Sequence, residues 1–176
     1  MKELQATSIT PIERENEKIY GLIKVLNFAE NLNMNIQIRL MKKEDAVTVS
    51  HLCSQLGYQI TAEQVTSNIQ LFLQKEDTAA FVAVYENVVA AWITVAYVIS
   101  ISALPVCEIR GLVVDEKYRR NNIGTMLIEK AKQWCKERDC NKLRLRCNAK
   151  RKEAHAFYLD LRFTEKKEQK VFEIET

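Results

Sequence analysis

The chain has 176 residues, 47% of them apolar, so it can form one domain with a proper core but leaves little room for a second. Its 26 basic and 23 acidic residues leave a net charge of +3, which is too small to indicate nucleic-acid binding. Five cysteines without a CxxC pair and only two histidines favour reduced, buried thiols over a disulfide framework or a metal site. No apolar run reads as a membrane span and no signal peptide is evident, so we expect a cytoplasmic protein that binds no metal.

The first half of the chain alternates between patterns typical of helices and of strands. Residues 1–34 are expected to form a partly helical N-terminal extension, and residues 35–176 the folded domain. The sequence NIQIRLM predicts a strand from residue 35, and a helix is expected over residues 43–55. Thr61 and Gln64 form a capping box that opens the next helix. Two β-rich runs, TAAFVAVY and VVAAWITVAYVIS, flank the dipeptide Glu86-Asn87, which predicts an antiparallel hairpin.

The second half continues with a fourth strand, VCEIRGLVVD, and then a helix whose buried face is predicted from Ile123, Leu127, Ala131 and Trp134. The run KLRLRCN predicts a fifth strand, and a helix is expected over residues 152–161. The last run, RFTEKKEQKVFEIET, predicts a strand, a turn and a final strand. The resulting order, β-α-α-β-β-β-α-β-α-β-β, predicts an α/β (α+β) fold in which helices cover both faces of a mixed sheet.

A basic turn leads into the helix that begins near Ile123. The first amides of a helix have no internal partner and lie at the positive end of its dipole, so they bind phosphate where the backbone can approach closely. Gly124 supplies a small side chain, and Asn121 and Asn122 tolerate left-handed backbone angles. Arg119 and Arg120 add positive charge. The pattern therefore favours a pyrophosphate site, with a solvated basic turn as the alternative.

Residues from Cys107 to Phe163 resemble the GCN5-related N-acetyltransferase (GNAT) family, and in particular its bacterial members that act on small molecules. The family's phosphate signature, Q/R-x-x-G-x-G/A, falls on residues 119–124, LVVD resembles its central strand, and NAKRKEAHAFYLDLRF its second motif. The resemblance extends over about residues 36–176. It implies a mostly antiparallel GNAT sheet, acetyl-CoA as the acetyl donor, and a primary amine that attacks directly in a ternary complex. Asn122 and Arg162 depart from the family by replacing glycines.

The resemblance also implies roles for individual residues. Tyr158 would be the general acid and Glu108 the general base, although Glu108 could instead form an ion pair with Arg110. Asn148 would contact the pantetheine arm or else cap the helix that follows it. The acetyl-CoA-binding residues would be Leu112, Val113, Val114, Arg119, Arg120, Asn121, Asn122, Ile123, Gly124, Thr125 and Asn148.

The acceptor amine is expected to be a small molecule, bound beside the connection from Gln55 to Ile60. Glu63 and Asp77 could attract a cationic acceptor or could simply cap and solvate helices. Two alternatives to this function are a non-catalytic acetyl-CoA sensor and an acetyltransferase for protein N-termini or lysines. We expect the protein to bind neither nucleic acids nor membranes. A homodimer is compatible with the resemblance.

Overall fold

The computed structural model describes residues 35–176, so the predicted extension, residues 1–34, lies outside the described residues. The elements in chain order are β1 (Ile36–Leu40), the 3₁₀ helix η1 (Lys43–Asp45), α2 (Ala46–Ser54), α3 (Ala62–Leu73), β2 (Thr78–Tyr85), β3 (Val88–Ser100), β4 (Ala103–Val114), the 3₁₀ helix η2 (Glu116–Tyr118), α4 (Ile123–Lys136), β5 (Leu143–Leu145) and α5 (Lys152–Asp160). None of these helices is long and apolar enough to cross a membrane.

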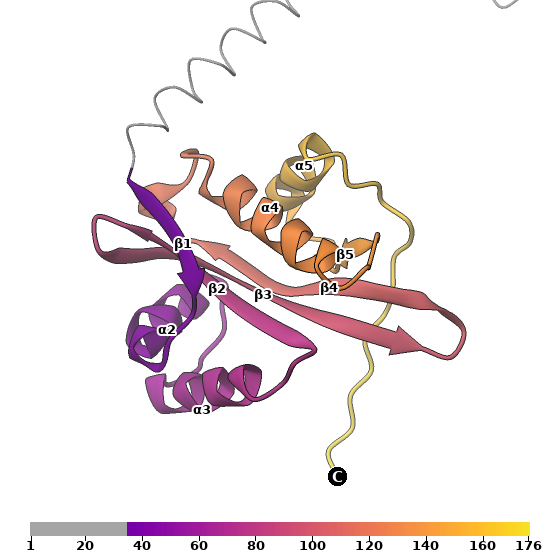
Figure 1. Ribbon diagram of the computed structural model, residues 1–176, viewed down its shortest axis with the longest axis horizontal. Coiled ribbons are helices and arrows are strands. Elements are labelled where there is room, and N and C mark those ends of the chain that lie inside the picture. Colours follow the sequence, from indigo (N-terminus) through magenta and orange to yellow (C-terminus); the bar gives the residue numbers. More distant parts are fainter. Residues whose placement is uncertain (1–34) are drawn as a thin grey trace, which may run out of the picture. The chain divides into compact units, whose positions relative to one another are not determined.

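The five strands form one sheet in the order β1-β2-β3-β4-β5. The β2–β3 and β3–β4 pairs are antiparallel, and the β4–β5 pair is parallel. Helices α2 and α3 lie on one face of the sheet, and α4 and α5 lie on the other (Figure 1). The predicted α/β class, the mixed sheet and the helices on both faces are therefore confirmed.

Local sequence signals account for two of the connections. Glu86 and Asn87 both have positive φ, +46° and +65°, which is the geometry that matches the twist of a two-residue hairpin. Thr61 Oγ1 accepts a hydrogen bond from the Gln64 amide at 3.3 Å, and Gln64 Oε1 accepts one from the Thr61 amide at 2.9 Å. The predicted hairpin and the predicted capping box are both present.

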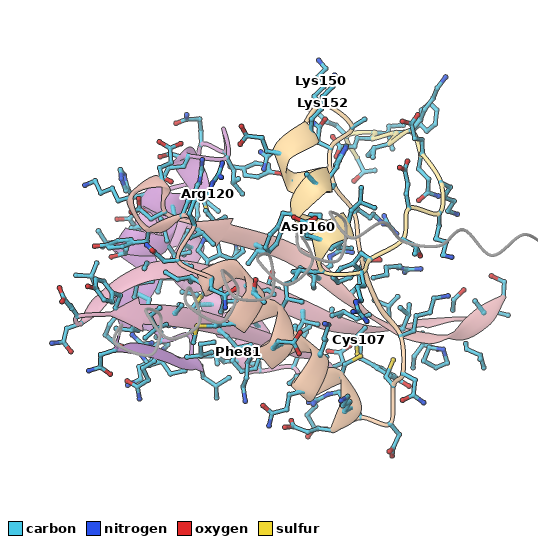
Figure 2. All side chains as sticks on the ribbon, turned by 90° about the horizontal axis from the view of Figure 1, so that it is seen from above. Phe81, Cys107, Arg120, Lys150, Lys152 and Asp160 are labelled. Atoms are coloured by element: carbon cyan, nitrogen blue, oxygen red, sulfur yellow. The ribbon has the colours of Figure 1, made fainter. Side chains whose placement is uncertain are left out.

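The core has two layers because alternate residues of the strands point to opposite faces of the sheet. Val82 and Val113 belong to the layer beneath α2 and α3, which also contains Leu52, Val65 and Ile69. On the other face, α4 buries the side chains predicted from its periodicity, Ile123, Leu127, Ala131 and Trp134. Figure 2 shows Phe81 beside α4, where Lys130 Nζ lies 5.5 Å from the centre of the Phe81 ring.

The two strands predicted at the C-terminus were wrong. Residues 164–176 form no strand, and Val171, Phe172 and Ile174 remain 80–89% exposed. This segment carries many charges and few apolar residues, and β5 offers an edge of only three residues. Too little surface can be buried there to offset the entropy lost by ordering the backbone.

The β3–β4 hairpin extends past its neighbouring strands. Pairing with β2 ends at Ala96, and pairing with β5 begins at Cys107. The residues of β3 and β4 beyond these positions form a two-stranded ribbon, which projects from the sheet (Figure 1). Its tip exposes Ile99, Ile101 and Leu104.

Three of the five cysteines meet where β4 passes the end of α4. The sulfur atoms of Cys107, Cys135 and Cys140 lie within 4.8 Å of one another, and all three residues are buried (Figure 2 labels Cys107). Cys135 Sγ donates a hydrogen bond to the Cys140 carbonyl oxygen at 3.1 Å. Burial raises the pKa of both the Cys107 and the Cys135 thiol, so these thiols are neutral. All five cysteines are free, as expected, and the absence of a metal stays a prediction.

Candidate functional site

The sheet opens between β4 and β5. The two strands pair only from Cys107 opposite Leu143 to Ile109 opposite Leu145. A β-bulge interrupts the β3–β4 register where Gly111 lies opposite Thr94 and Ile109 opposite Val95. A bulge bends its strand, and beyond this one β4 has no partner among the described strands on its β5 side. We call this unpaired edge, residues 110–114 of β4, the open edge.

The open edge includes three predicted acetyl-CoA-binding residues, Leu112, Val113 and Val114. The Val113 side chain is only 2% exposed and packs in the core beneath α2 and α3. Backbone amide and carbonyl groups on the β5 side of the same strand have no neighbouring strand to bond among the described residues. The strand can therefore contribute side chains to the core and backbone groups to a ligand.

Gly111 lets the ring of Trp92 lie against the open edge. A Cβ atom at this position would be 2.6 Å from both Cη2 and Cζ3 of Trp92, and 3.5 Å from Thr94 Oγ1. The indole Nε1 is buried and has no hydrogen-bond partner among the described residues. The glycine is thus required by a close side-chain approach, which agrees with the close approach or bulge expected for a glycine within a strand.

The N-terminus of α4 carries free amides. Asn122 is in the left-handed conformation, with φ +60° and ψ +5°, and its side chain does not cap the helix. The first backbone bond runs from the Met126 amide to the Asn122 carbonyl at 3.1 Å. The amides of Ile123, Gly124 and Thr125 therefore have no partner within the helix, and together with the dipole they suit a phosphate group.

The basic turn before α4 is held by its own contacts. Arg119 Nε donates to the Val114 carbonyl at 3.4 Å, and Asn121 Nδ2 donates to the Tyr118 carbonyl at 3.3 Å. Arg120, rather than Asn121, is the second residue with a left-handed backbone, at φ +66°. Its side chain is exposed on the loop that leads into α4 (Figure 2). Arg120 forms no ion pair with any described residue, so its positive charge lies beside the amides of α4 that have no helical partner.

Gly124 leaves room for an aromatic side chain of α5, a contact that we did not predict from the sequence. It is buried, and a Cβ atom there would be 3.0 Å from Phe157 Cζ and 3.6 Å from Val114 Cγ2. Close approach of a phosphate, the reason expected from the sequence, stays a prediction. In the structure the missing side chain makes room for the aromatic ring of α5, which packs on the first turn of α4.

Tyr158 lies between two aromatic rings of the same region. Its ring centroid is 5.3 Å from that of Phe157 and 5.8 Å from that of Phe163. Burial, with a further contribution from Cys147, raises the pKa of Tyr158 to about 12, although Arg151 acts in the opposite direction. The phenol is therefore a neutral hydrogen-bond donor near neutral pH.

Asn148 organises the turn that leads into α5. Its Oδ1 accepts a hydrogen bond from the Lys150 amide at 2.9 Å, and its carbonyl oxygen accepts one from the Arg151 amide at 2.9 Å. His155 Nε2 lies 3.0 Å from the same carbonyl oxygen. Asn148 is therefore not the cap expected as the alternative to a pantetheine contact, because the N-cap residue of α5 is Arg151 and no side chain caps the helix. The pantetheine contact stays a prediction.

The connection between α2 and α3 reaches both sides of the site. Gln55 Oε1 accepts a hydrogen bond from the Glu116 amide at 3.2 Å, just after β4. The Leu56 carbonyl accepts one from Arg151 Nη2 at 2.7 Å, just before α5. The segment expected to form the acceptor wall is therefore fastened beside the open edge and beside α5.

Glu108 is buried among arginines. It is 2% exposed, and its carboxylate lies 2.7 Å from Arg110 Nη1, 2.6 Å from Arg144 Nε and 3.6 Å from Arg146 Nη2. Burial alone raises the pKa of Glu108, but hydrogen bonds from Arg144 and Arg110 outweigh it and hold the pKa below its ordinary value. The expected pair with Arg110 is present.

Arg144 and Arg146 were not predicted as site residues. Both lie in the run LRLR, where arginine alternates with the leucines of β5. Alternation places the two arginines on one face of the strand. That signal was available from the sequence, but their shared partner Glu108 lies 36 residues away from Arg144 and is found only from the parallel register.

Solved structures with the same fold include proteins of several kinds. A transcriptional regulator from Bacillus halodurans C-125 has a TM-score of 0.71 and 19% identity, covering 80% of this chain and 100% of its own. An aminoglycoside N-acetyltransferase, AAC(6')-Iy in complex with CoA, has a TM-score of 0.69 and 20% identity, and the match covers 81% of this chain and 96% of that protein. Glucosamine-6-phosphate N-acetyltransferase from Arabidopsis thaliana has a TM-score of 0.68 and 22% identity, and the match covers 80% of this chain and 99% of that protein. At these identities the similarity shows a shared fold. Residues 47–163 match the model of the Acetyltransferase (GNAT) family, and the chain therefore belongs to that family.

Proposed function

We propose that this protein transfers the acetyl group of acetyl-CoA to a primary amine of a small molecule, which attacks directly while both substrates are bound. The observation that carries the proposal is the open edge of β4 next to the free amides at the start of α4. Structural neighbours that acetylate aminoglycosides or glucosamine 6-phosphate support a small-molecule acceptor.

The residues around the open edge fit acetyl-CoA. The free amides of the first turn of α4, with Arg119 and Arg120 beside them, would hold the pyrophosphate. The backbone of residues 112–114 would pair with the extended pantetheine arm as a further strand, because that edge has no other partner among the described strands. When bound, acetyl-CoA supplies an activated acetyl thioester. An amide of the open edge would then stabilise negative charge that develops on the acetyl oxygen.

Tyr158 acts in this proposal as a hydrogen-bond donor to the leaving sulfur. A thiol ordinarily has a pKa near ~8.5, whereas that of Tyr158 is about 12. Complete proton transfer from the phenol to a thiolate would therefore be unfavourable by roughly 5 kcal/mol. The phenol can instead stabilise the thiolate while keeping its proton, and water supplies the proton that the sulfur finally takes up.

Glu108 is better suited to positioning than to proton abstraction. Arg110 and Arg144 each bond one of its carboxylate oxygens, and its lowered pKa makes it a weak base. We therefore assign removal of the amine proton to water at the open edge. Glu108 instead holds the side chains of Arg110 and Arg144 at the start of the open edge.

The test is a turnover assay with acetyl-CoA, in which release of free thiol is followed across a panel of amines. The panel contains aminoglycosides, amino sugars and their phosphates, polyamines, amino acids and N-terminal peptides. Tyr158→Phe should lower kcat about 10- to 100-fold, the value of one hydrogen bond to a charged group, with little change in the Kd of acetyl-CoA. Tyr97→Phe, which alters a partly exposed tyrosine of β3, is the matched control.

Three results would contradict parts of the proposal. Equal kcat for Tyr158→Phe and the wild type would remove the phenol from the mechanism. Binding of acetyl-CoA without thiol release from any amine would support a non-catalytic sensor, and turnover of N-terminal peptides alone would support a protein acetyltransferase.

A further inference from the structure

Three arginines surround a single carboxylate at the start of the open edge. Arg110, Arg144 and Arg146, which we call the arginine cluster, all form their ion pairs with Glu108. No other carboxylate of the described residues pairs with them. Three positive charges and one negative charge leave the cluster with an excess of two positive charges (3 − 1 = 2).

The structural needs of Glu108 do not account for the whole cluster. Its two oxygens are already bonded by Arg110 at 2.7 Å and by Arg144 at 2.6 Å. Arg146 adds only a contact at 3.6 Å, and its side chain is 65% exposed. Like charges held this close repel one another, so the arrangement is more favourable when a further anion binds.

The cluster faces the side of the sheet away from α4. Cys107 points toward α4, because its sulfur lies beside that of Cys135. Glu108 follows it in the strand and so points to the opposite face, as does Arg144, its register partner on β5. Arg110 stands at the bulge, two residues before Leu112, which is about 7 Å along an extended strand. An anion on the cluster would therefore lie beside the edge that we assign to the pantetheine arm.

We propose that the acceptor amine also carries an acidic group, a phosphate or a carboxylate, and that the arginine cluster binds this group. The inference rests on the proposed function, because it assigns the open edge to the acetyl donor. Guanidinium groups present paired N–H donors that match the oxygens of either anion. Glu108 holds the base of the cluster, so the exposed nitrogen atoms of the arginines are oriented in advance.

The two acidic residues considered as attractors for a cationic acceptor have local roles instead. Hydrogen bonds from its own amide and from Thr61 lower the pKa of Glu63, which lies in the first turn of α3. The backbone of Asp77 accepts a hydrogen bond from the Tyr97 amide at 2.7 Å. Among the described residues, no ion pair joins either carboxylate to the open edge.

The first experiment measures anion binding without turnover. The protein is saturated with CoA and titrated with inorganic phosphate or with acetate, while the arginine Nε–Hε signals are followed by NMR. The signals of Arg144 and Arg146 should shift saturably. Arg146→Gln should weaken binding about 10-fold, as expected for one charge-assisted contact that is partly exposed. Lys136→Gln removes one positive charge at the exposed end of α4 and should leave binding unchanged.

The second experiment compares amines that differ only in the acidic group. Glucosamine and glucosamine 6-phosphate test the phosphate, and 6-aminohexanamide and 6-aminohexanoate test the carboxylate. The acidic member of at least one pair should have a kcat/KM about 10-fold or more above its neutral partner, and Arg146→Gln should abolish this preference.

The outcomes separate the inference from the proposed function. Turnover of neutral and acidic members at equal kcat/KM, with no saturable arginine shifts, would overturn the inference and leave the proposed function intact. Saturable anion binding with no turnover of any amine would overturn the proposed function and support the cluster as an anion site. Preference for the acidic members that persists in Arg146→Gln and is lost in Lys136→Gln would overturn the assignment to the cluster.

Discussion

Replacing Gly111 by alanine should destabilise the fold through a single contact. The new Cβ atom would lie 2.6 Å from two ring carbons of Trp92, whereas ordinary van der Waals contacts begin at 3.4 Å. The ring must therefore move by nearly an ångström inside a packed layer. Overpacking of this kind costs about 1–3 kcal/mol, and alanine regains about 0.5–1 kcal/mol over glycine in a strand. We expect Gly111→Ala to lower the free energy of unfolding by about 1–2 kcal/mol.

A double-mutant cycle isolates this contact. Phenylalanine at position 92 lacks the Cζ3 and Cη2 atoms that the new methyl group would meet, so Trp92→Phe should remove most of the cost of Gly111→Ala. Urea unfolding followed by far-UV circular dichroism should give a favourable coupling energy of about 1–2 kcal/mol between the two changes. Gly57→Ala is the matched control, because Gly57 has φ +89° and no atom of residues 35–176 lies within 4 Å of the position that its new methyl group would take.

The control should also lose about 1 kcal/mol, from backbone strain, but should show no coupling to Trp92. Effects of Gly111→Ala and Trp92→Phe that add to within about 0.5 kcal/mol would refute the steric argument.

Three further predictions concern charge and backbone geometry. Arg120→Glu should weaken CoA binding about 10-fold at low salt and less at high salt, whereas Lys136→Glu at the far end of α4 should leave CoA binding unchanged. Equal effects of the two variants in calorimetry would contradict the phosphate assignment. Arg162→Gly should raise the free energy of unfolding by about 1 kcal/mol because Arg162 has φ +64°, and no gain in urea unfolding would refute this. Hydrogen bonds from Arg39 and the Lys42 amide outweigh burial and lower the pKa of Asp45. The ionised carboxylate therefore stabilises the fold at pH values above its ordinary pKa of 3.8, and this stabilisation is lost as the pH falls below that value. Asp45→Asn should therefore cost about 2 kcal/mol at pH 7, and the difference should shrink toward pH 2; a constant difference would refute the linkage.

Much of the fold could be predicted because its signals are local. The Glu86-Asn87 turn, the Thr61–Gln64 capping box and the apolar face of α4 each depend on residues within a few positions of one another. Arg162 replaces a glycine of the family pattern, and its φ of +64° shows that the left-handed geometry is kept. The C-terminal strands were wrong because a strand also needs an edge to pair with and a surface to cover, and neither can be read from the segment itself.

The candidate site could be predicted less completely because its geometry is tertiary. The position of the free amides follows from a local pattern, the turn before Ile123. The room that Gly124 leaves for Phe157 and the burial of Glu108 by Arg144 depend instead on how α5 and β5 pack. Sequence spacing suggested which residues carry chemistry but not which of them share a partner.

The ribbon at the tip of β3 and β4 has a consequence for motion within the sheet. Apart from the bond between the Tyr97 amide and the Asp77 carbonyl, the β3–β4 ladder holds it, and no described strand flanks it beyond Ala96 and before Cys107. Opening this end locally breaks fewer contacts than opening the centre, so its amides should exchange with solvent deuterons first. The same two strands are anchored by the core at Val95 and Val113, and fluctuations at the tip should fade before they reach the open edge.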